Sequence, residues 1–245
     1  MPTTSTPWLD ADHVCLDRSG RPVLHDVSLQ IRPGEVIGVV GRNGAGKTSL
    51  LETLLGFHRL QSGSVQLWGR PVRQLRGEDK RRIGFVPQQD ELLDGLTGWQ
   101  QVTLISSFYP EWDAALLARL GEDWQLPLAR PIRQWSLGQR QKLSIVLALA
   151  SGPDLLVLDE PVASLDPLAR AQFLAEMTAL ATNPARALVF SSHIVADLAG
   201  LVNRLWLVDA GRLHWQGSVA DVGRLTGHTG NGPVNLEAAF RQLLA

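Results

Sequence analysis

The chain has 245 residues, which is enough for one large domain or for one domain with an inserted subdomain. Hydrophobic residues make up 44% of it, as in an ordinary globular core. Its 23 Lys and Arg nearly balance 24 Asp and Glu, and the net charge of -1 argues against nucleic acid as a partner.

The N-terminal part predicts two strands, a buried strand and a helix. The strands are expected at Trp8–Asp17 and Val23–Ile31, with a turn at Arg18–Pro22 between them. The lone cysteine, Cys15, cannot form an internal disulfide, so we interpret it as a small buried strand residue. The apolar run Val36–Val40 is typical of a strand buried on both faces, and an apolar helix is expected at 47–55.

The rest of the chain alternates short apolar strands with helical segments, which predicts parallel strands with helical crossovers. Strands are expected at 65–68, 83–86, 155–158 and 187–190, followed by a hairpin made of 205–208 and 212–215. We expect a helical insert at 91–139. Its tryptophans either pack its core or line a groove for a partner helix; they are Trp99, Trp112 and Trp124.

Neither a signal peptide nor a membrane span is expected. Residues 1–12 lack a basic start followed by an apolar stretch. The longest apolar run, Leu143–Ala150, falls short of the about 20 residues that cross a bilayer. We therefore expect the chain to act at a membrane only through another protein.

The strongest motif is the segment 41–48, which matches G-x-x-x-x-G-K-[ST] between the buried strand and the helix. Its glycines let backbone N–H groups face phosphate oxygens, and the helix adds its positive N-terminal end. Lys47 would reach the β- and γ-phosphates, and the Thr48 hydroxyl would bind Mg²⁺. The predicted nucleotide-binding residues here are Gly41, Asn43, Gly44, Ala45, Gly46, Lys47, Thr48 and Ser49.

A second motif follows the apolar run 155–158. That strand delivers Asp159 to a metal, and Glu160, one residue further, points to the place of an attacking water. Two adjacent carboxylates after a buried strand, together with the glycine-rich loop, predict a site for a nucleotide and Mg²⁺.

The segment Trp135–Gln139 resembles L-S-G-G-Q, the signature of the ATP-binding cassette (ABC) family. The resemblance implies that Ser136, Gly138 and Gln139 close over ATP bound to a second subunit. It also implies an α/β fold: a P-loop NTPase (RecA-like) core with an N-terminal antiparallel β subdomain and an inserted helical subdomain. One ABC ATPase domain would span 1–245, with the β-rich part at 1–35, the core at 36–90 and 140–245, and the helical part at 91–139.

Three more segments match motifs of that family. Gln88 ends the Q-loop and would touch Mg²⁺ or the water, Asp166 lies in the D-loop between two sites, and His193 is the switch histidine near the γ-phosphate. The resemblance implies that Glu160 accepts the proton of the water. The implied catalytic residues are Glu160, His193, Lys47 and Gln88, and the implied Mg²⁺ ligands are Thr48, Gln88 and Asp159.

The sequence departs from the family pattern at two places. Leu137 replaces the first signature glycine and Trp135 the usual leucine, so we expect a working signature with altered packing. The family usually stacks an aromatic residue on adenine, but the segment 16–20 has none. Either Arg18 stacks by its guanidinium plane, or base selectivity is weak.

The resemblance implies ATP and Mg²⁺ as ligands, a second ATPase subunit in a homodimer, an integral membrane permease and no nucleic acid. The chain would lie at the cytoplasmic face of the cell membrane as a peripheral protein. The segments 108–113 and 236–240 are similar to bacterial exporter ATPases, which implies export. The alternatives are a soluble ABC ATPase with a non-membrane partner and an ATP binder without hydrolysis; Glu160 and His193 argue against the latter.

Overall fold

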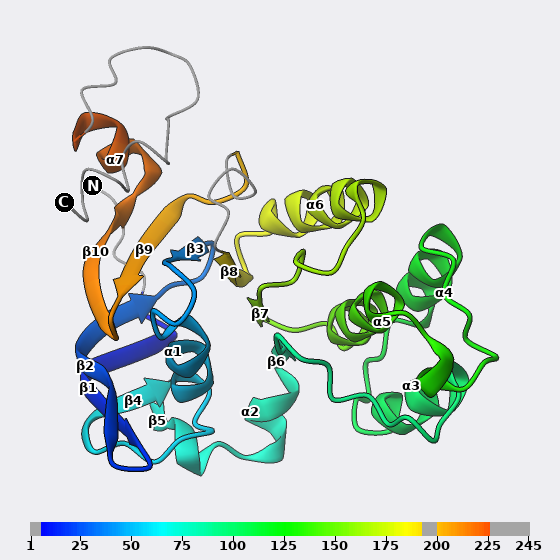
Figure 1. The fold of residues 1–245 in the computed structure, drawn as a ribbon, viewed down its shortest axis with the longest axis horizontal. Coiled ribbons are helices and arrows are strands. Elements are labelled where there is room, and N and C mark those ends of the chain that lie inside the picture. Colours follow the sequence, from blue (N-terminus) through cyan, green and yellow to red (C-terminus); the bar gives the residue numbers. More distant parts are fainter. Residues whose placement is uncertain (1–5, 193–199, 226–245) are drawn as a thin grey trace. The chain divides into compact units, whose positions relative to one another are not determined.

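The computed structural model describes residues 6–192 and 200–225, and the chain divides into two units (Figure 1). The first unit combines residues 1–75 with 180–245, and the second contains 76–179. No helix within the described ranges is long and apolar enough to cross a bilayer.

The first unit contains an antiparallel sheet of β1 (Leu9–Arg18), β2 (Arg21–Ile31), β4 (Ser62–Leu67) and β5 (Arg70–Pro71), in the order β2-β1-β4-β5. The turn between β1 and β2 contains only Ser19 and Gly20, with φ of 50° and 75°. Positive φ at both positions gives a tight turn that matches the twist of the strands. The expected strand at 65–68 joins this sheet, because β4 pairs with β1 from Leu67 to Ser62.

A second group of strands in this unit is built around β3 (Val36–Val40). It runs parallel to β8 (Ala187–Ser192) on one side and to β9 (Arg204–Asp209) on the other. All residues of β3 and β8 are buried, which explains why their sequences are continuous apolar runs. β10 (Arg212–Ser218) closes the expected hairpin with β9, and α7 (Val219–Leu225) follows it.

The turn of that hairpin holds the glycine-rich loop. Ala210 and Gly211 have φ of 44° and 72°. The Gly211 N–H donates to the Ala45 carbonyl oxygen (2.8 Å), and the Gly211 carbonyl oxygen accepts from the His25 N–H (2.9 Å). A Cβ on Gly211 would overlap the carbonyl oxygen of Val23 in β2. Only glycine therefore lets this turn lie between the loop and β2.

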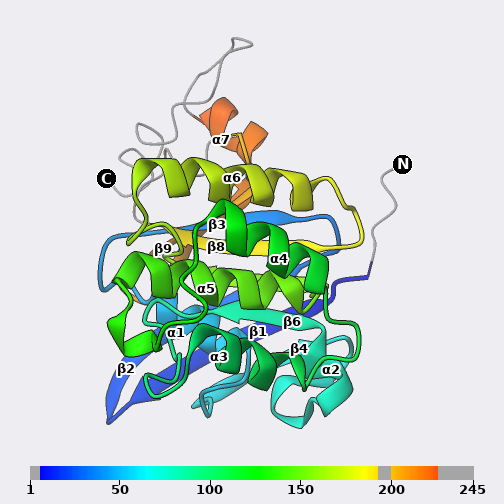
Figure 2. The same cartoon turned by 90° about the vertical axis from the view of Figure 1, so that its right-hand side faces the viewer.

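The second unit contains a parallel pair of strands, β6 (Ile83–Val86) and β7 (Leu155–Asp159). Two short 3-10 turns lie at Val72–Gln74 and Ile132–Gln134, the first of them in the first unit. In Figure 2 the helices α3 and α4 flank α5, and both pack against it. The helices of the second unit are α2 (Gly77–Arg81), α3 (Gly98–Ser106), α4 (Ala114–Asp123), α5 (Leu137–Ala150) and all but the last two residues of α6 (Pro167–Ala181).

Side-chain caps fix where the helices of the second unit begin. Thr97 and Ser136 form capping boxes with Gln100 and Gln139, and Asp113 accepts from the N–H of Leu116. Of the tryptophans in the expected insert, Trp124 is buried, Trp112 is half-buried and Trp99 is 50% exposed.

We predict that the Gly211 turn is a sensitive position of the first unit. Gly211→Ala should lower the free energy of unfolding by about 3 kcal/mol or more, because the added methyl group meets the backbone of β2. Gly20→Ala is the matched control: its φ is 75°, but a Cβ there meets nothing within 4 Å. It should cost only the left-handed strain of about 1–2 kcal/mol. Urea unfolding measures both changes, and equal costs would contradict the prediction.

Candidate nucleotide-binding site

The glycine-rich loop leaves β3 in the first unit with little free space. A Cβ on Gly41 would overlap the carbonyl oxygen of Val208, so the loop backbone lies directly against β9. Gly44 and Gly46 have φ of 79° and 102°, which other residues rarely adopt. The loop thus curves tightly into α1 (Lys47–Leu54), as the motif predicts.

The N-terminus of α1 is suited to an anion. Its N-cap residue is Gly46, which offers no side-chain cap, and its first turn carries no acidic residue. The first N–H groups of a helix need partners and lie at its positive end. A side-chain oxygen caps the start of α3, α4 and α5, but no side chain caps α1. The first N–H groups of α1 can therefore bind phosphate oxygens.

Lys47 lies across the loop. Its side chain is only 6% exposed, and Nζ donates to the carbonyl oxygens of Gly41 (2.9 Å) and Arg42 (3.3 Å). The ammonium group is therefore held beside the backbone that would surround a phosphate. Thr48, half-buried in the first turn of α1, follows directly.

The two adjacent carboxylates lie at the end of β7 in the second unit. Asp159 is fully buried and Glu160 is 6% exposed. Glu160 has φ of 49°, a left-handed conformation that is uncommon and strained for a residue other than glycine. Such strain is found mainly at functional sites. Gln88, two residues after β6, is exposed.

The signature segment starts α5. The Ser136 Oγ accepts from the N–H of Gln139 (3.2 Å), and the Gln139 side chain accepts from the N–H of Ser136 (3.0 Å). A hydroxyl group accepts and donates, so the Ser136 proton remains for another oxygen. Of the two departures from the family pattern, Leu137 is 71% exposed, whereas Trp135 is buried and donates to the Arg130 carbonyl oxygen (3.1 Å).

The signature and the D-loop lie together in this unit. A Cβ on Gly138 would come within 2.8 Å of the Ser164 carbonyl oxygen. Asp166 accepts from the N–H of Ala169 (2.9 Å), and so it caps α6. This backbone hydrogen bond lowers the pKa of the Asp166 carboxyl, and Lys142, 3.9 Å away, adds to the effect.

The predicted residues therefore fall into two groups. The loop residues 41–49 gather in the first unit, while Gln88, the signature, Asp159, Glu160 and Asp166 belong to the second. His193 and the segment 236–240 lie outside the described residues. Arg18, at the end of β1, is 4.0 Å from Glu52 of α1.

Three features of this region were not predicted from the sequence. They are the Gly211 turn against Ala45, the approach of Gly138 to Ser164, and a set of ion pairs from Arg140 to Asp90 and Asp94. The sequence contained a signal for the first two features. Gly211 follows Ala210 in a hairpin turn and Gly138 stands in the first turn of a helix, and a glycine at such a position favours close contact between backbones. The ion pairs join residues about fifty positions apart, and no local pattern indicates them.

Comparison with known proteins identifies the family of this chain. A family model described as ABC transporter matches residues 24–163. An uncharacterised ABC transporter ATP-binding protein of Synechocystis sp. is 33% identical over 206 residues, 81% of this chain and 57% of that protein. The Nod factor export ATP-binding protein I of Cupriavidus metallidurans is 31% identical over 83% of this chain and 66% of its own length. The methionine import ATP-binding protein MetN of Mesorhizobium japonicum is 33% identical over 82% of this chain and 58% of its own.

Solved structures confirm the expected fold. A structure of the ATP-binding subunit of an ABC transporter has a TM-score of 0.85 at 25% identity, and the match covers 98% of this chain and 100% of that one. A dimeric ATP-binding cassette bound to ADP and phosphate has a TM-score of 0.75 at 21% identity, covering 86% and 98%. The chain spans only 57% to 66% of the length of the three relatives described above.

We predict that the cap at Ser136 has two effects that can be separated. Ser136→Ala and Thr97→Ala each remove a capping box, and each should cost about 1 kcal/mol of unfolding free energy. Only the Ser136 change removes the hydroxyl of the signature, so only it should lower ATP turnover. Urea unfolding and phosphate release measure the two effects, and equal turnover in both variants would refute the assignment.

Proposed function

Because this chain belongs to the ABC transporter family, we propose that it binds ATP with Mg²⁺ and hydrolyses it to power a transporter. The observation that carries the proposal is the phosphate cradle of the first unit: α1 begins without a side-chain cap, and Lys47 is held beside the loop by two carbonyl oxygens. Hydrolysis of ATP to ADP and phosphate needs charge stabilisation and an aligned water more than covalent chemistry.

Each residue then has a defined task. Lys47 and the first amides of α1 bind the β- and γ-phosphates. Glu160 accepts the proton of the attacking water, and His193 holds the γ-phosphate. The Mg²⁺ ligands are Thr48, Gln88 and Asp159, and the hydroxyl, amide and carboxylate oxygens of these side chains suit Mg²⁺. When bound, the ion neutralises charge on the phosphate oxygens.

A second copy of the chain completes the site in this proposal. Ser136, Gly138 and Gln139 act on ATP bound to the other subunit, and Asp166 lies in the loop between the two sites. Three observations support this: the Ser136 hydroxyl keeps a proton to donate, Leu137 projects with 71% exposure, and Gly138 lies against the D-loop at Ser164. Bound ATP then favours the closed homodimer, and hydrolysis of the ATP allows the dimer to open.

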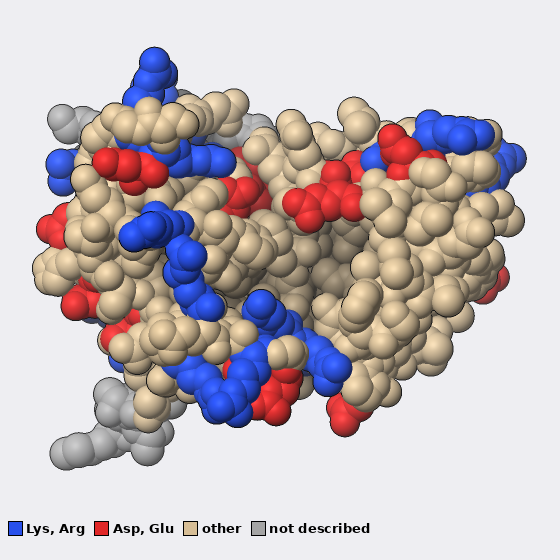
Figure 3. Space-filling view, turned by 90° about the horizontal axis from the view of Figure 1, so that it is seen from below, with Lys and Arg blue, Asp and Glu red and all other residues tan. Residues whose placement is uncertain are grey.

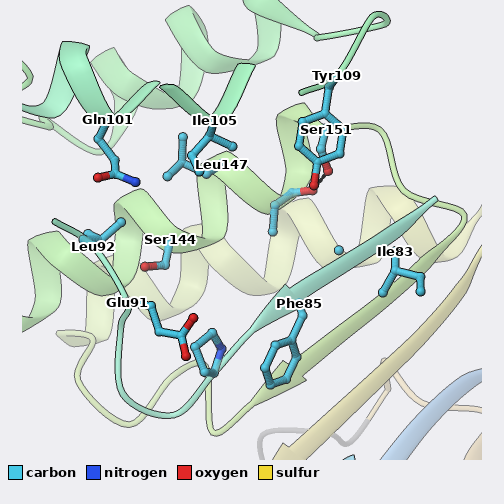
Figure 4. Close-up of a pocket in the computed structure, with 13 residues that line it drawn as sticks. Ile83, Phe85, Glu91, Leu92, Gln101, Ile105, Tyr109, Ser144, Leu147 and Ser151 are labelled. Atoms are coloured by element: carbon cyan, nitrogen blue, oxygen red, sulfur yellow. Dashed lines mark hydrogen bonds between the residues drawn. The ribbon is translucent and has the colours of Figure 1, made fainter. Parts of the chain in front are cut away.

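A groove in the second unit supports a membrane partner (Figure 4). It has a volume of about 240 Å³ and lies between β6, α3 and α5, where Phe85, Ile105 and Leu147 form its apolar lining. In Figure 4, Ile105 and Tyr109 lie on the side of α3, opposite Phe85. The exposed Phe108 and Leu104 are neighbours of these residues in the chain. We propose that the groove receives a short helix of the permease, which keeps this subunit at the cytoplasmic face of the cell membrane.

The tryptophans have little part in this groove. Trp124 and Trp135 are buried, and none of the four tryptophans from 99 to 135 is among the lining residues. Of the two predicted roles, packing in the core of the helical part fits Trp124 best.

The alternative function is a soluble ABC ATPase with a non-membrane partner. The net charge of -1 argues against DNA or RNA as a partner, and on the face shown in Figure 3 acidic side chains lie beside the basic ones. We propose export as the direction because the segment 108–113 is similar to exporter ATPases. The similar relatives include one named for export and one named for import, and in this proposal the permease selects the substrate.

We predict that Glu160→Gln separates ATP binding from cleavage. The amide cannot accept the proton, so the ATPase rate should fall by about a hundredfold or more, while ATP should trap a dimer visible by size-exclusion chromatography with light scattering. Lys47→Ala is the control, because it should lose ATP binding and the dimer together. Normal turnover by Glu160→Gln would remove this residue from its task.

We predict that the groove decides which protein the chain binds in the membrane. The tagged chain, purified from detergent-solubilised membranes of its source, should carry a polytopic membrane protein in stoichiometric amount. Ile105→Glu should remove that protein, because a charge in the groove excludes an apolar helix face. Trp99→Ala is the control, since Trp99 is 50% exposed and does not line the groove.

The soluble alternative has a distinct outcome in the same purification. A set of ribosomal or DNA-associated proteins, retained by the Ile105→Glu variant, would keep the ATPase and refute the transporter.

A further inference from the structure

In the second unit, one arginine joins the signature helix to the segment that follows Gln88. Arg140, four residues after Ser136, donates from Nε and Nη2 to the Asp90 carboxylate at 2.7 to 3.1 Å. Its Nη1 donates to Asp94 and to the Ile132 carbonyl oxygen. We call these contacts of Arg140 with Asp90 and Asp94 the Arg140 clamp. A guanidinium group held by two carboxylates has a fixed orientation, because its donors form a rigid plane.

Within the clamp the Arg140–Asp90 pair is shielded from solvent, whereas Asp94 is 68% exposed. Arg140 and Asp90 are 16% and 12% exposed, whereas Arg119, paired with Glu176, is 48% exposed. The hydrogen bonds to Asp90 raise the pKa of Arg140, so its charge is constant. Removing one member of a shielded pair leaves the other charge without compensation, which costs more than losing an exposed pair.

The clamp also borders the proposed docking groove. Asp90 and Asp94 enclose Glu91 and Leu92, which both line the groove. Gln101 of α3 holds this segment too, because its side chain accepts from the N–H of Leu93 (3.1 Å). On the other side, Ser144 lies one turn after Arg140 in α5 and lines the groove as well. The groove wall and the first turn of α5 are therefore connected through Arg140.

We propose that Arg140 is a positioning residue for ATP hydrolysis: it fixes the first turn of α5, which carries Ser136 and Gly138, to the groove wall at Asp90–Asp94. This inference rests on the proposed function. Arg140 touches no nucleotide in this scheme. It acts by orienting the signature toward the ATP bound to the second subunit. It also connects the signature to the groove, so that a helix bound in the groove can affect the position of the signature.

The test compares Arg140→Gln, Arg140→Lys and the charge exchange Asp90→Arg with Arg140→Asp. The matched control is Arg119→Gln, which breaks another bidentate arginine–carboxylate pair of the same unit. ATPase rates are measured against ATP concentration, together with thermal unfolding and equilibrium binding of MgADP. MgADP binding reports on the phosphate cradle of the first unit, whereas the residues of the clamp belong to the second unit.

Arg140→Gln should lower kcat by about tenfold or more, with MgADP affinity unchanged within about twofold, because a displaced signature weakens only the reacting state. Arg140→Lys should be intermediate, since lysine lacks the planar fork. The charge exchange should recover part of kcat. Arg119→Gln should keep the wild-type rate even if it lowers the melting temperature as much as Arg140→Gln does.

A second readout uses the Glu160→Gln background. Glu160→Gln with Arg140→Gln should fail to form the ATP-trapped dimer at ATP concentrations that trap Glu160→Gln alone, whereas Glu160→Gln with Arg119→Gln should form it. Wild-type kcat and normal trapping in the Arg140→Gln chains would overturn the inference and leave the proposed function intact. A wild-type chain without ATPase activity would instead overturn the proposed function, and the inference with it.

Discussion

The first unit depends on the hydrogen bond from the Gly211 N–H to the Ala45 carbonyl oxygen. It joins the glycine-rich loop to the hairpin of β9 and β10, and the Gly211 carbonyl oxygen continues the chain of contacts to His25 of β2. A Cβ on Gly41 would overlap the carbonyl oxygen of Val208, so the loop also lies against β9. Backbone contacts on both sides hold this loop in one conformation, and preorganisation of the proposed phosphate site would make electrostatic stabilisation effective. The left-handed turn in the β9–β10 hairpin thus holds the glycine-rich loop in place.

In the second unit the first turn of α5 has a comparable role. Within five residues it contains the capping hydroxyl of Ser136, the close approach of Gly138 to Ser164, and Arg140 with its two carboxylates. These contacts fix the start of the helix to the D-loop and to the segment after Gln88. The positive N-terminal end of α5 and the hydroxyl proton of Ser136 are then held in a fixed orientation in which they can face an anion. The departures at Trp135 and Leu137 leave these contacts in place.

The sequence allowed prediction of those elements in which one residue pattern has one physical solution. The run Val36–Val40, followed by the glycine-rich loop, is compatible only with a buried strand before a phosphate loop, and β3 and α1 lie where expected. The capping box of Ser136 and Gln139 is likewise visible in the sequence. The membership of β4 in the antiparallel sheet and the pairing of Arg140 with Asp90 are different. Both depend on which distant segments meet, and that is determined by packing rather than by local pattern.

The shielding of the Arg140–Asp90 pair has a consequence for the effect of salt. Ions screen charges in solution over about 8 Å at physiological ionic strength, but they reach a pair that is 16% and 12% exposed poorly. Exposed pairs such as Arg119 with Glu176 weaken as the salt concentration rises. The start of α5 therefore stays attached to the segment after Gln88 at salt concentrations that weaken exposed ion pairs of the same unit.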